Sequence, residues 1–196
     1  MTDTSVTKAS SAGSWIFRGL VVVAFGVMLV SWFMPWWSAD IEMLGYNIIQ
    51  IRPWGLQLGE RLGGFGILLK GAAMPAWFAP MMWAYLGACM LALLVGILAE
   101  EKVISYRNFK MKLSQFLVGG VGLSYIIAGI VAAVYASIRM GNMGGIALQG
   151  RTFVDLGDPL ATNVDTRLLP GYYLIYVAGI LFLVLAIFRD TITGEE

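Results

Sequence analysis

The sequence predicts an all-α integral membrane protein: four transmembrane helices in a single domain, with a small extracytoplasmic, β-containing cap built from two loops. Three observations predict this class. The 196-residue chain is 59% hydrophobic and only 13% charged, with a mean hydropathy of +0.77, whereas soluble proteins carry about 25% charged residues. Four apolar runs are long enough for a hydrocarbon core about 30 Å thick. Short β-prone segments lie between the first and second runs, and again between the third and fourth.

The first apolar run, residues 15–37, predicts an uncleaved membrane span. Arg18 near its start can reach back to lipid head groups, which fits a cytoplasmic N-terminus. A cleaved signal peptide is the alternative, but it needs a shorter run and small residues at the cleavage site, where this chain has Trp36 and Trp37. We expect the polar residues 1–14 to form a flexible cytoplasmic tail.

Residues 38–79 are too polar and too interrupted to span, and we expect them to form the larger outer loop. A Gly-Tyr-Asn turn at residues 45–47 separates two β-prone runs within residues 40–52 and predicts a β-hairpin. The Pro-Trp-Gly sequence at residues 53–55 ends this hairpin.

The last part of the same loop, residues 56–78, is apolar and rich in glycine but carries Glu60, Arg61 and Lys70. Three charges argue against a span. We therefore expect an interfacial or re-entrant segment that lies on the membrane.

The second and third spans, about residues 80–99 and 113–138, are joined by a short basic turn, residues 100–112. Small residues recur every four positions on both spans, which places them on one stripe of each helix, and such a stripe lets two helix backbones approach closely. We expect a tight transmembrane hairpin against which the other two spans pack. The predicted packing residues are Ala84, Ala88, Ala92 and Gly96 on one span and Gly120, Ser124, Ala128, Ala132 and Ala136 on the other.

Residues 139–169 form the second predicted outer loop, in which residues 146–155 resemble another small hairpin with its turn at Gly150-Arg151. The fourth span, residues 170–188, begins at a proline, and residues 189–196 form a cytoplasmic tail. Each half of the chain thus has a span, a short β element and a proline-started span, which is a weak internal repeat.

Aromatic residues gather at the predicted outer ends of the spans. Tryptophan and tyrosine favour the interface between membrane and water. The expected interfacial belt consists of Trp32, Trp36, Trp37, Trp77, Trp83, Tyr172 and Tyr173.

Basic residues predict the orientation of the spans. The turn at 100–112 is the most densely basic part of the chain, whereas the basic residues of the two outer loops are spread over a much longer stretch. This density predicts a multi-pass plasma-membrane protein with both termini in the cytoplasm. A basic turn can also bind anionic head groups, but topology alone accounts for these residues, and we favour that explanation.

The sequence shows no catalytic, cofactor-binding or metal-binding constellation. It has no histidine, and its one cysteine, Cys89, lies in an apolar run, where packing is the simplest role. The middles of the spans lack charged residues, which argues against a proton-coupled pump. Soft thioethers suit Cu(I) and carboxylates suit Ca²⁺, but apolar packing and solvated loops explain the two candidate sets more simply. These sets are Met74, Met81, Met82, Met140 and Met143, and Asp155, Asp158, Asn163 and Asp165.

The layout resembles the claudin-like four-span proteins in topology: a large first outer loop, a smaller second loop and a small outer β-sheet. The claudin signature requires paired loop cysteines beside its tryptophans. This chain has Trp36, Trp37 and Trp54 but no cysteine in either loop. The resemblance therefore implies neither membership of that family nor any functional residue.

Three functions fit these observations. The first is a non-catalytic accessory subunit of a larger integral membrane complex, respiratory or of membrane-oxygenase type, with other membrane subunits and lipids as partners. The second is an oligomeric transporter or channel for a small solute or lipid. The third is a sensor or adhesion module that acts through the outer cap. The net charge of +1 gives no field that would favour nucleic acid.

Overall fold

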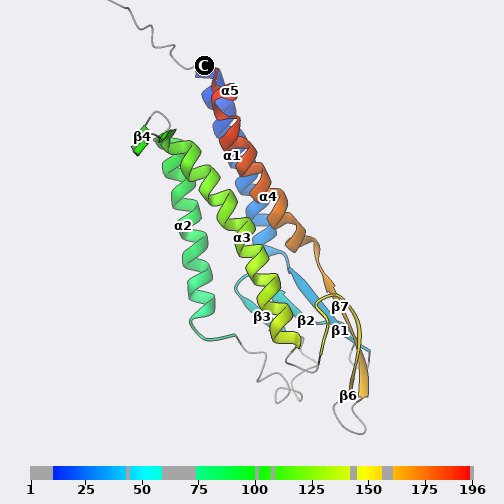
Figure 1. Cartoon of the computed structure of the whole chain (residues 1–196). Helices are drawn as coiled ribbons and strands as arrows, with labels where there is room; N and C mark the ends of the chain where they lie inside the picture. The colour runs from blue at the N-terminus through cyan, green and yellow to red at the C-terminus, as the bar shows by residue number, and fades with distance from the viewer. Residues whose placement is uncertain are drawn as a thin grey trace, which may run out of the picture.

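The computed structural model describes residues 11–42, 45–58, 74–99, 102–106, 109–141, 145–155 and 161–194, and these ranges are mostly helical, with a small antiparallel sheet at one end (Figure 1). Within them, four helices are long and apolar enough to cross a membrane, as predicted. A short fifth helix, α5, follows the last of these. The helices are α1 (Ser11–Phe33), α2 (Phe78–Leu98), α3 (Leu113–Gly141), α4 (Pro170–Ile187) and α5 (Arg189–Thr193).

The first helix differs most from its predicted span. It begins four residues before Trp15, within the predicted tail, and ends at Phe33 instead of Trp37. Trp37 is already the first residue of strand β1 (Trp37–Ile41), because Pro35 cannot continue the helix and the chain turns directly into the sheet. The other three helices lie within three residues of their predicted bounds at each end.

The five-stranded sheet is built from both of the loops that were expected to form the cap. Its order is β3-β2-β1-β7-β6, and every neighbouring pair is antiparallel. The loop after α1 supplies three strands and the loop after α3 supplies two, so the central pair β1–β7 joins the two halves of the chain. The further strands are β2 (Gly45–Arg52), β3 (Gly55–Leu58), β6 (Gly150–Asp155) and β7 (Ala161–Leu168).

The first predicted hairpin exists as β1 and β2 with its turn placed wrongly, whereas the hairpin predicted within residues 146–155 is wrong, because β6 begins where its turn was expected and pairs with β7. Gly45 starts β2 and pairs with Ile41, and Gly150 starts β6, whose partner strand follows it in sequence. Their φ angles are +113° and +124°, a backbone conformation that favours glycine. The two glycines therefore occupy the first positions of strands and are not the central residues of turns. The stretch expected to lie on the membrane begins with β3, and its residues 59–73 lie outside the described part.

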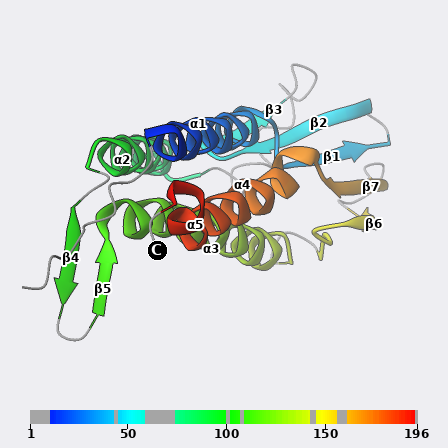
Figure 2. The ribbon, with the colours of Figure 1, turned by 90° about the horizontal axis from the view of Figure 1, so that it is seen from above.

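The basic turn between α2 and α3 contains a second, two-stranded sheet that the sequence did not predict: β4 (Val103–Tyr106) and β5 (Phe109–Lys112). The Leu113 amide donates to the Lys102 carbonyl over 2.7 Å, and the Lys102 amide donates to the Ala99 carbonyl over 3.1 Å. These bonds hold the base of the hairpin at the ends of both helices. We call this the hairpin end of the molecule, and the opposite end the sheet end (Figure 2).

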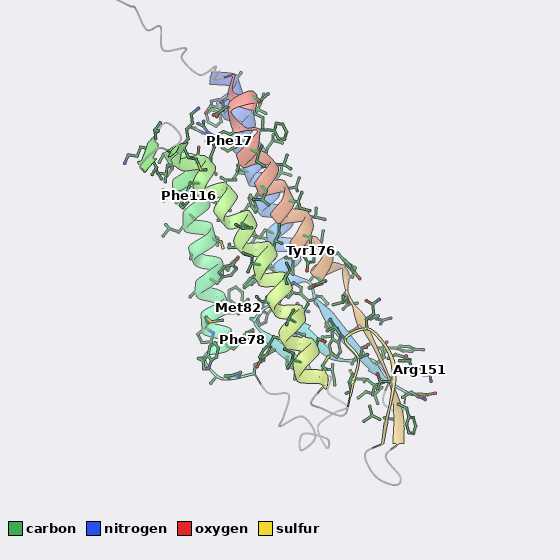
Figure 3. All side chains as sticks on the ribbon, in the orientation of Figure 1. Phe17, Phe78, Met82, Phe116, Arg151 and Tyr176 are labelled. Carbon is green, nitrogen blue, oxygen red and sulfur yellow. The ribbon has the colours of Figure 1, made fainter. Side chains whose placement is uncertain are left out.

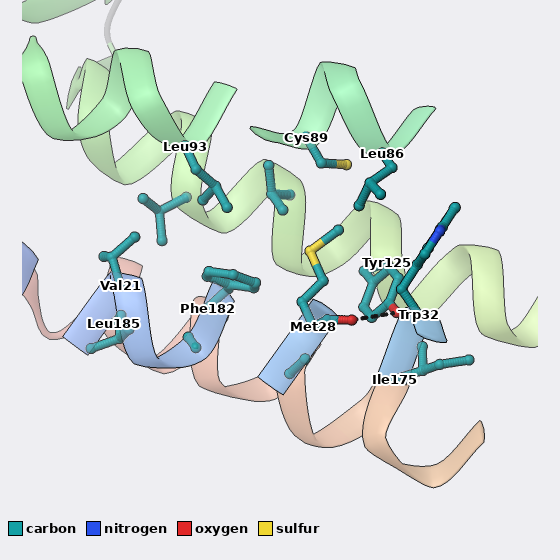
Figure 4. Packing of buried hydrophobic residues seen from close by; sticks show 14 of the residues in the cluster. Val21, Met28, Trp32, Leu86, Cys89, Leu93, Tyr125, Ile175, Phe182 and Leu185 are labelled. Atoms are coloured by element: carbon teal, nitrogen blue, oxygen red, sulfur yellow. Dashed lines mark hydrogen bonds between the residues drawn. The ribbon is translucent and has the colours of Figure 1, made fainter. Parts of the chain in front are cut away.

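Helices α1, α3 and α4 form the tightest part of the bundle. A Cβ atom added at Gly122 of α3 would lie 2.6 Å from the carbonyl oxygen of Gly179 in α4, and one added at Gly171 would lie 2.7 Å from the Pro35 carbonyl oxygen. Backbone meets backbone at both places because no side chain intervenes. Large buried side chains fill the remaining space, including Met28, Trp32, Tyr125 and Phe182 (Figure 4) and Phe17.

A second, smaller core lies on one face of the sheet. Trp37 and Ala39 of β1 pack there with Val154 of β6, Val164 of β7 and Met140 at the end of α3. The indole N–H of Trp37 donates to the Leu148 carbonyl over 2.7 Å. The sheet is thereby fixed to the end of the helical bundle.

Candidate functional site

The predicted stripe on α2 is not packed along its length. Ala84 and Ala88 are exposed, Ala92 is half-buried, and only Gly96 is buried. A Cβ atom at Gly96 would lie 3.5 Å from Leu117 and 3.6 Å from Val118, which is ordinary contact with α3. The buried face of α2 consists instead of Leu86, Cys89, Leu93 and Gly96.

The stripe on α3 behaves similarly. Gly120 is exposed with nothing within 4 Å of an added Cβ atom, whereas Ser124, Ala128, Ala132 and Ala136 are half-buried. The close backbone contact of α3 lies on another face, where Gly119, Gly122 and Gly129 meet α4. The seven-residue spacing of Gly122 and Gly129 was the available signal for this face, because two helical turns separate residues seven apart.

The two stripes border an open groove between α2 and α3, with a volume of about 240 Å³. Ala88, Ala92, Gly120 and Ser124, all members of the predicted stripes, lie on its walls, and their small size is what leaves the space open. Phe116, which Figure 3 labels, also lines it. The remaining lining residues are Tyr85, Cys89, Leu117 and Val121. The sequence pattern thus located the correct pair of helices, but the tight contact that it predicted is a groove.

The groove has one polar feature. The Tyr85 hydroxyl lies 3.0 Å from the Ser124 Oγ atom, and Ser124 donates its single proton to the Val121 carbonyl over 2.9 Å. Tyr85 must therefore donate to Ser124, which leaves the lone pairs of the Tyr85 oxygen as acceptors. None of the nine lining residues carries a charge at neutral pH. The groove suits an apolar occupant with at most one donor near Tyr85.

A second polar group joins the helices of the tight bundle. Tyr125 of α3 donates to the Ser31 Oγ atom over 3.1 Å, and Ser31 of α1 donates to the Gly171 carbonyl over 2.8 Å. Tyr125 and Ser31 are fully buried. These two hydrogen bonds connect α1, α3 and α4. Because each hydroxyl donor has an acceptor within the bundle, we assign the two residues to helix packing.

The residues of the predicted aromatic belt divide into two groups. Trp32, Trp36, Trp37 and Tyr172 are buried in the protein, whereas Trp77, Trp83 and Tyr173 are exposed. Trp32 lies at the centre of an aromatic cluster at the sheet end of α1 and α2. Its ring centroid is 6.1 Å from that of Trp83, 6.4 Å from that of Trp54 and 6.4 Å from that of Tyr85. The four buried residues pack between elements of the protein. For the three exposed residues, a location at the membrane–water interface stays a prediction.

The loop carboxylates of the sheet take part in ion pairs. Glu42 lies 3.0 Å from Arg151 and accepts from Asn163 over 2.6 Å, while Asp40 lies 3.2 Å from Arg167. The hydrogen bond from Asn163, with the charge of Arg151, lowers the pKa of Glu42. Within the described residues, no group of three or more His, Cys, Asp or Glu side chains could hold a metal ion.

A charged cluster joins α5 to the start of α3 at the hairpin end. Asp190 accepts from Lys112 over 2.6 Å, from Gln115 over 3.0 Å and from Arg189 over 3.1 Å. Arg189 is fully buried, with its guanidinium carbon 5.7 Å from the ring centroid of Phe17. Partial burial acts to raise the pKa of Asp190, but Lys112, Gln115 and Arg189 together hold it below the ordinary value.

The chain matches no protein-family model, and no curated protein matches it in sequence. Its class is therefore defined by the fold: four apolar helices consistent with a multi-pass membrane protein, with a small antiparallel sheet at one end.

Proposed function

We propose that this protein is a non-catalytic accessory subunit of a larger integral membrane complex, respiratory or of membrane-oxygenase type, and that it stabilises its partner subunits. The helices cross the plasma membrane, both termini lie in the cytoplasm, and the five-stranded sheet forms the extracytoplasmic cap. The observation that carries this proposal is the groove between α2 and α3.

The groove is suited to a transmembrane helix of a partner subunit. Small walls at Ala88, Ala92 and Gly120 let a second helix backbone come close, and van der Waals packing of this kind drives helix association in a membrane. We define the rim by helix position: Leu91 and Leu123 follow Ala88 and Gly120 by three residues and so share their helix faces, and they are 62% and 52% exposed. A partner helix would cover both the groove and its rim.

Transport of a small lipid or solute by an oligomer is the second candidate function. The open side of the groove favours it, because a lipid chain could enter from the surrounding bilayer. The two functions differ in what the groove contacts in the membrane: a different protein in the first case, and a transported molecule or a second copy of this chain in the second.

Gentle detergent extraction followed by native mass measurement tests these functions. Unrelated partner chains in fixed stoichiometry support the accessory role, a homo-oligomer supports the transporter, and an isolated monomer would overturn both.

The substitution Ala88→Leu sharpens this test by filling the groove. We expect it to release the partners while the isolated subunit keeps its thermal stability. Val177→Leu adds bulk at an exposed position on α4, outside the groove, and should leave the complex intact. Equal loss of partners in both variants would remove the groove as the docking site.

A further inference from the structure

The groove between α2 and α3 is short and is bounded at both ends. Towards the sheet end, the Tyr85 hydroxyl meets Ser124 over 3.0 Å. Towards the hairpin end, α2 approaches α3 at Gly96, where an added Cβ atom would already be in van der Waals contact. On α2 the lining begins at Tyr85 and ends at Ala92, a length of about 10 Å at 1.5 Å per residue. A helix with its side chains is itself about 10–12 Å wide, so the groove receives a side chain of a covering helix and not the helix itself.

The volume of the groove suits a large aromatic side chain. An apolar cavity of about 150 Å³ binds benzene, whereas this groove has a volume of about 240 Å³. The difference leaves room for a second ring. A small side chain such as serine or threonine would leave most of this space empty, and unfilled apolar volume destabilises a packed contact.

The polar chemistry of the groove favours an occupant that only donates. Tyr85 donates to Ser124, and Ser124 donates to the Val121 carbonyl. Neither hydroxyl has a proton left, whereas the Tyr85 oxygen still has lone pairs to accept with. The Cys89 thiol lies within hydrogen-bonding reach of both hydroxyls, but a thiol is a weak donor. An occupant with an acceptor of its own would therefore meet no strong donor, and a buried acceptor without a partner is costly.

Tryptophan is the side chain that combines these properties. Its indole has two fused rings, one N–H donor and no acceptor. Phenylalanine has no donor, and tyrosine has a single ring and carries an acceptor oxygen with its donor. Tryptophan is also among the residues that contribute most to binding at protein interfaces.

We infer that the groove receives the indole of a tryptophan from a transmembrane helix of the partner subunit, and that the indole N–H donates to the Tyr85 oxygen. This inference rests on the proposed function, because it names the side chain by which the partner docks. Tyr85 lies seven residues after Phe78, the first residue of α2, and so about 10 Å from the start of that span. The partner's tryptophan lies at this depth, whereas most tryptophans of membrane proteins lie at the interface. The depth therefore distinguishes one partner helix from another.

Model transmembrane peptides test the choice of side chain. Four leucine–alanine helices carry tryptophan, 1-methyltryptophan, tyrosine or phenylalanine at their centre. Native mass spectrometry measures their affinity for the purified chain in phosphatidylcholine nanodiscs. We expect the tryptophan peptide to bind most tightly, and methylation of the ring nitrogen to weaken binding about three- to fivefold, the effect of one hydrogen bond in a membrane. Equal affinity of the tryptophan and 1-methyltryptophan peptides would overturn the inference.

Tyr85→Phe is the matched variant, because it removes the acceptor oxygen and keeps the ring. We expect the affinity of the tryptophan peptide to fall by the same factor, and the difference between the tryptophan and 1-methyltryptophan peptides to disappear. Tyr173→Phe changes an exposed tyrosine on α4, outside the groove, and should leave every affinity unchanged. A difference between the two peptides that persists in Tyr85→Phe would come from the bulk of the methyl group and would overturn the inference.

Ala88→Leu separates failure of this inference from failure of the proposed function. If all four peptides bind equally and Ala88→Leu releases them, a helix docks at the groove without a preference for tryptophan, and only the inference fails. A partner subunit that Ala88→Leu releases but that has no tryptophan within its span leads to the same conclusion. Binding of no peptide, or a homo-oligomer that Ala88→Leu dissociates, would overturn both the inference and docking of a partner subunit at the groove.

Discussion

The interfaces of α3 with its two neighbouring helices use small residues in opposite ways. Towards α4, Gly122 and Gly179 bring the two backbones into contact, and a Cβ atom at Gly122 would lie only 2.6 Å from the Gly179 carbonyl oxygen. Towards α2, Ala88 and Gly120 border a groove of about 240 Å³. The first interface is complete within the chain, and the second has space for another molecule.

The difference lies in whether both helices present a matching surface. On the α4 side, glycine faces glycine and the neighbouring Ile126 and Phe182 close around the contact. On the α2 side, Tyr85 reaches across to Ser124 while Gly120 faces open space. Small residues therefore allow two helices to approach closely. Whether a helix of the same chain does so depends on the shape of the surface that this helix presents.

The largest expected effect comes from Gly122→Ala. The added Cβ atom meets backbone that cannot move aside, so we expect a loss of about 2 kcal/mol or more in the free energy of unfolding. Gly120→Ala, two residues away on the same helix, is the control. Nothing lies within 4 Å of its new methyl group, and alanine favours the helix by up to about 1 kcal/mol. Thermal unfolding followed by circular dichroism compares them, and equal destabilisation of both would contradict the glycine contact.

The next effect distinguishes the two tyrosine hydrogen bonds. Tyr125→Phe removes a fully buried bond between α3 and α1, and we expect a loss of about 1 kcal/mol in unfolding free energy. Tyr85→Phe removes the bond across the groove, but Ser124 keeps its bond to Val121. The second loss should therefore be smaller, about 0.5 kcal/mol or less. The reverse order in thermal unfolding would show that the groove wall is the more rigid interface.

A third prediction concerns pH at the hairpin end. The pKa of Asp190 is held below its ordinary value of 3.8, so the stabilisation it provides is present above that value and is lost as the pH falls through the lower, folded pKa. Asp190→Asn should cost about 0.5 kcal/mol at neutral pH, because the carboxylate is partly exposed. The difference in melting temperature between wild type and this variant should shrink below about pH 4. A difference that persists at acid pH would exclude the charge of Asp190 as its source.

The smallest effect on stability is expected for Ala88→Leu. Its side chain enters the groove without meeting the core, so the unfolding free energy of the isolated chain should change by no more than about 0.5 kcal/mol. A loss comparable to that of Gly122→Ala would mean that α2 and α3 pack tightly at this point, as the sequence pattern suggests.

The helices were predictable because length and apolar character alone define them. Pro170 begins α4 where proline is tolerated, and the predicted ends of α2, α3 and α4 lie within three residues of the observed ends. The end of α1 was missed because Trp36 and Trp37 are as apolar as the helix before them. Nothing in hydropathy distinguishes a buried strand residue from a residue of the span.

The sheets and the site were less predictable for separate physical reasons. Gly45 and Gly150 were predicted to lie in turns because glycine is common there. Both have positive φ angles, but each is the first residue of a strand. In residues 109–112, apolar and basic residues alternate, a strand pattern that the density of basic charge obscured. The four-residue period of small residues identified the sides of α2 and α3 that border the groove. It could not show whether the facing helix has a surface of matching shape. The shape of the facing helix determines whether α2 and α3 are in close contact or leave a groove between them.

The pairing of β1 with β7 has a consequence for biosynthesis. Strand β1 follows α1 directly and β7 directly precedes α4, so α1 packs beside α4 and β1 pairs with residues 164–168 of β7 (Figure 1). Trp36 and Leu169, more than a hundred residues apart, are joined by a backbone hydrogen bond of 2.9 Å. During translation, the first helix and the central strand therefore lack these partners until β7 and α4 have been synthesised. Over that interval one edge of β1 and one side of α1 stay open to chaperones, to the insertion machinery and to premature association.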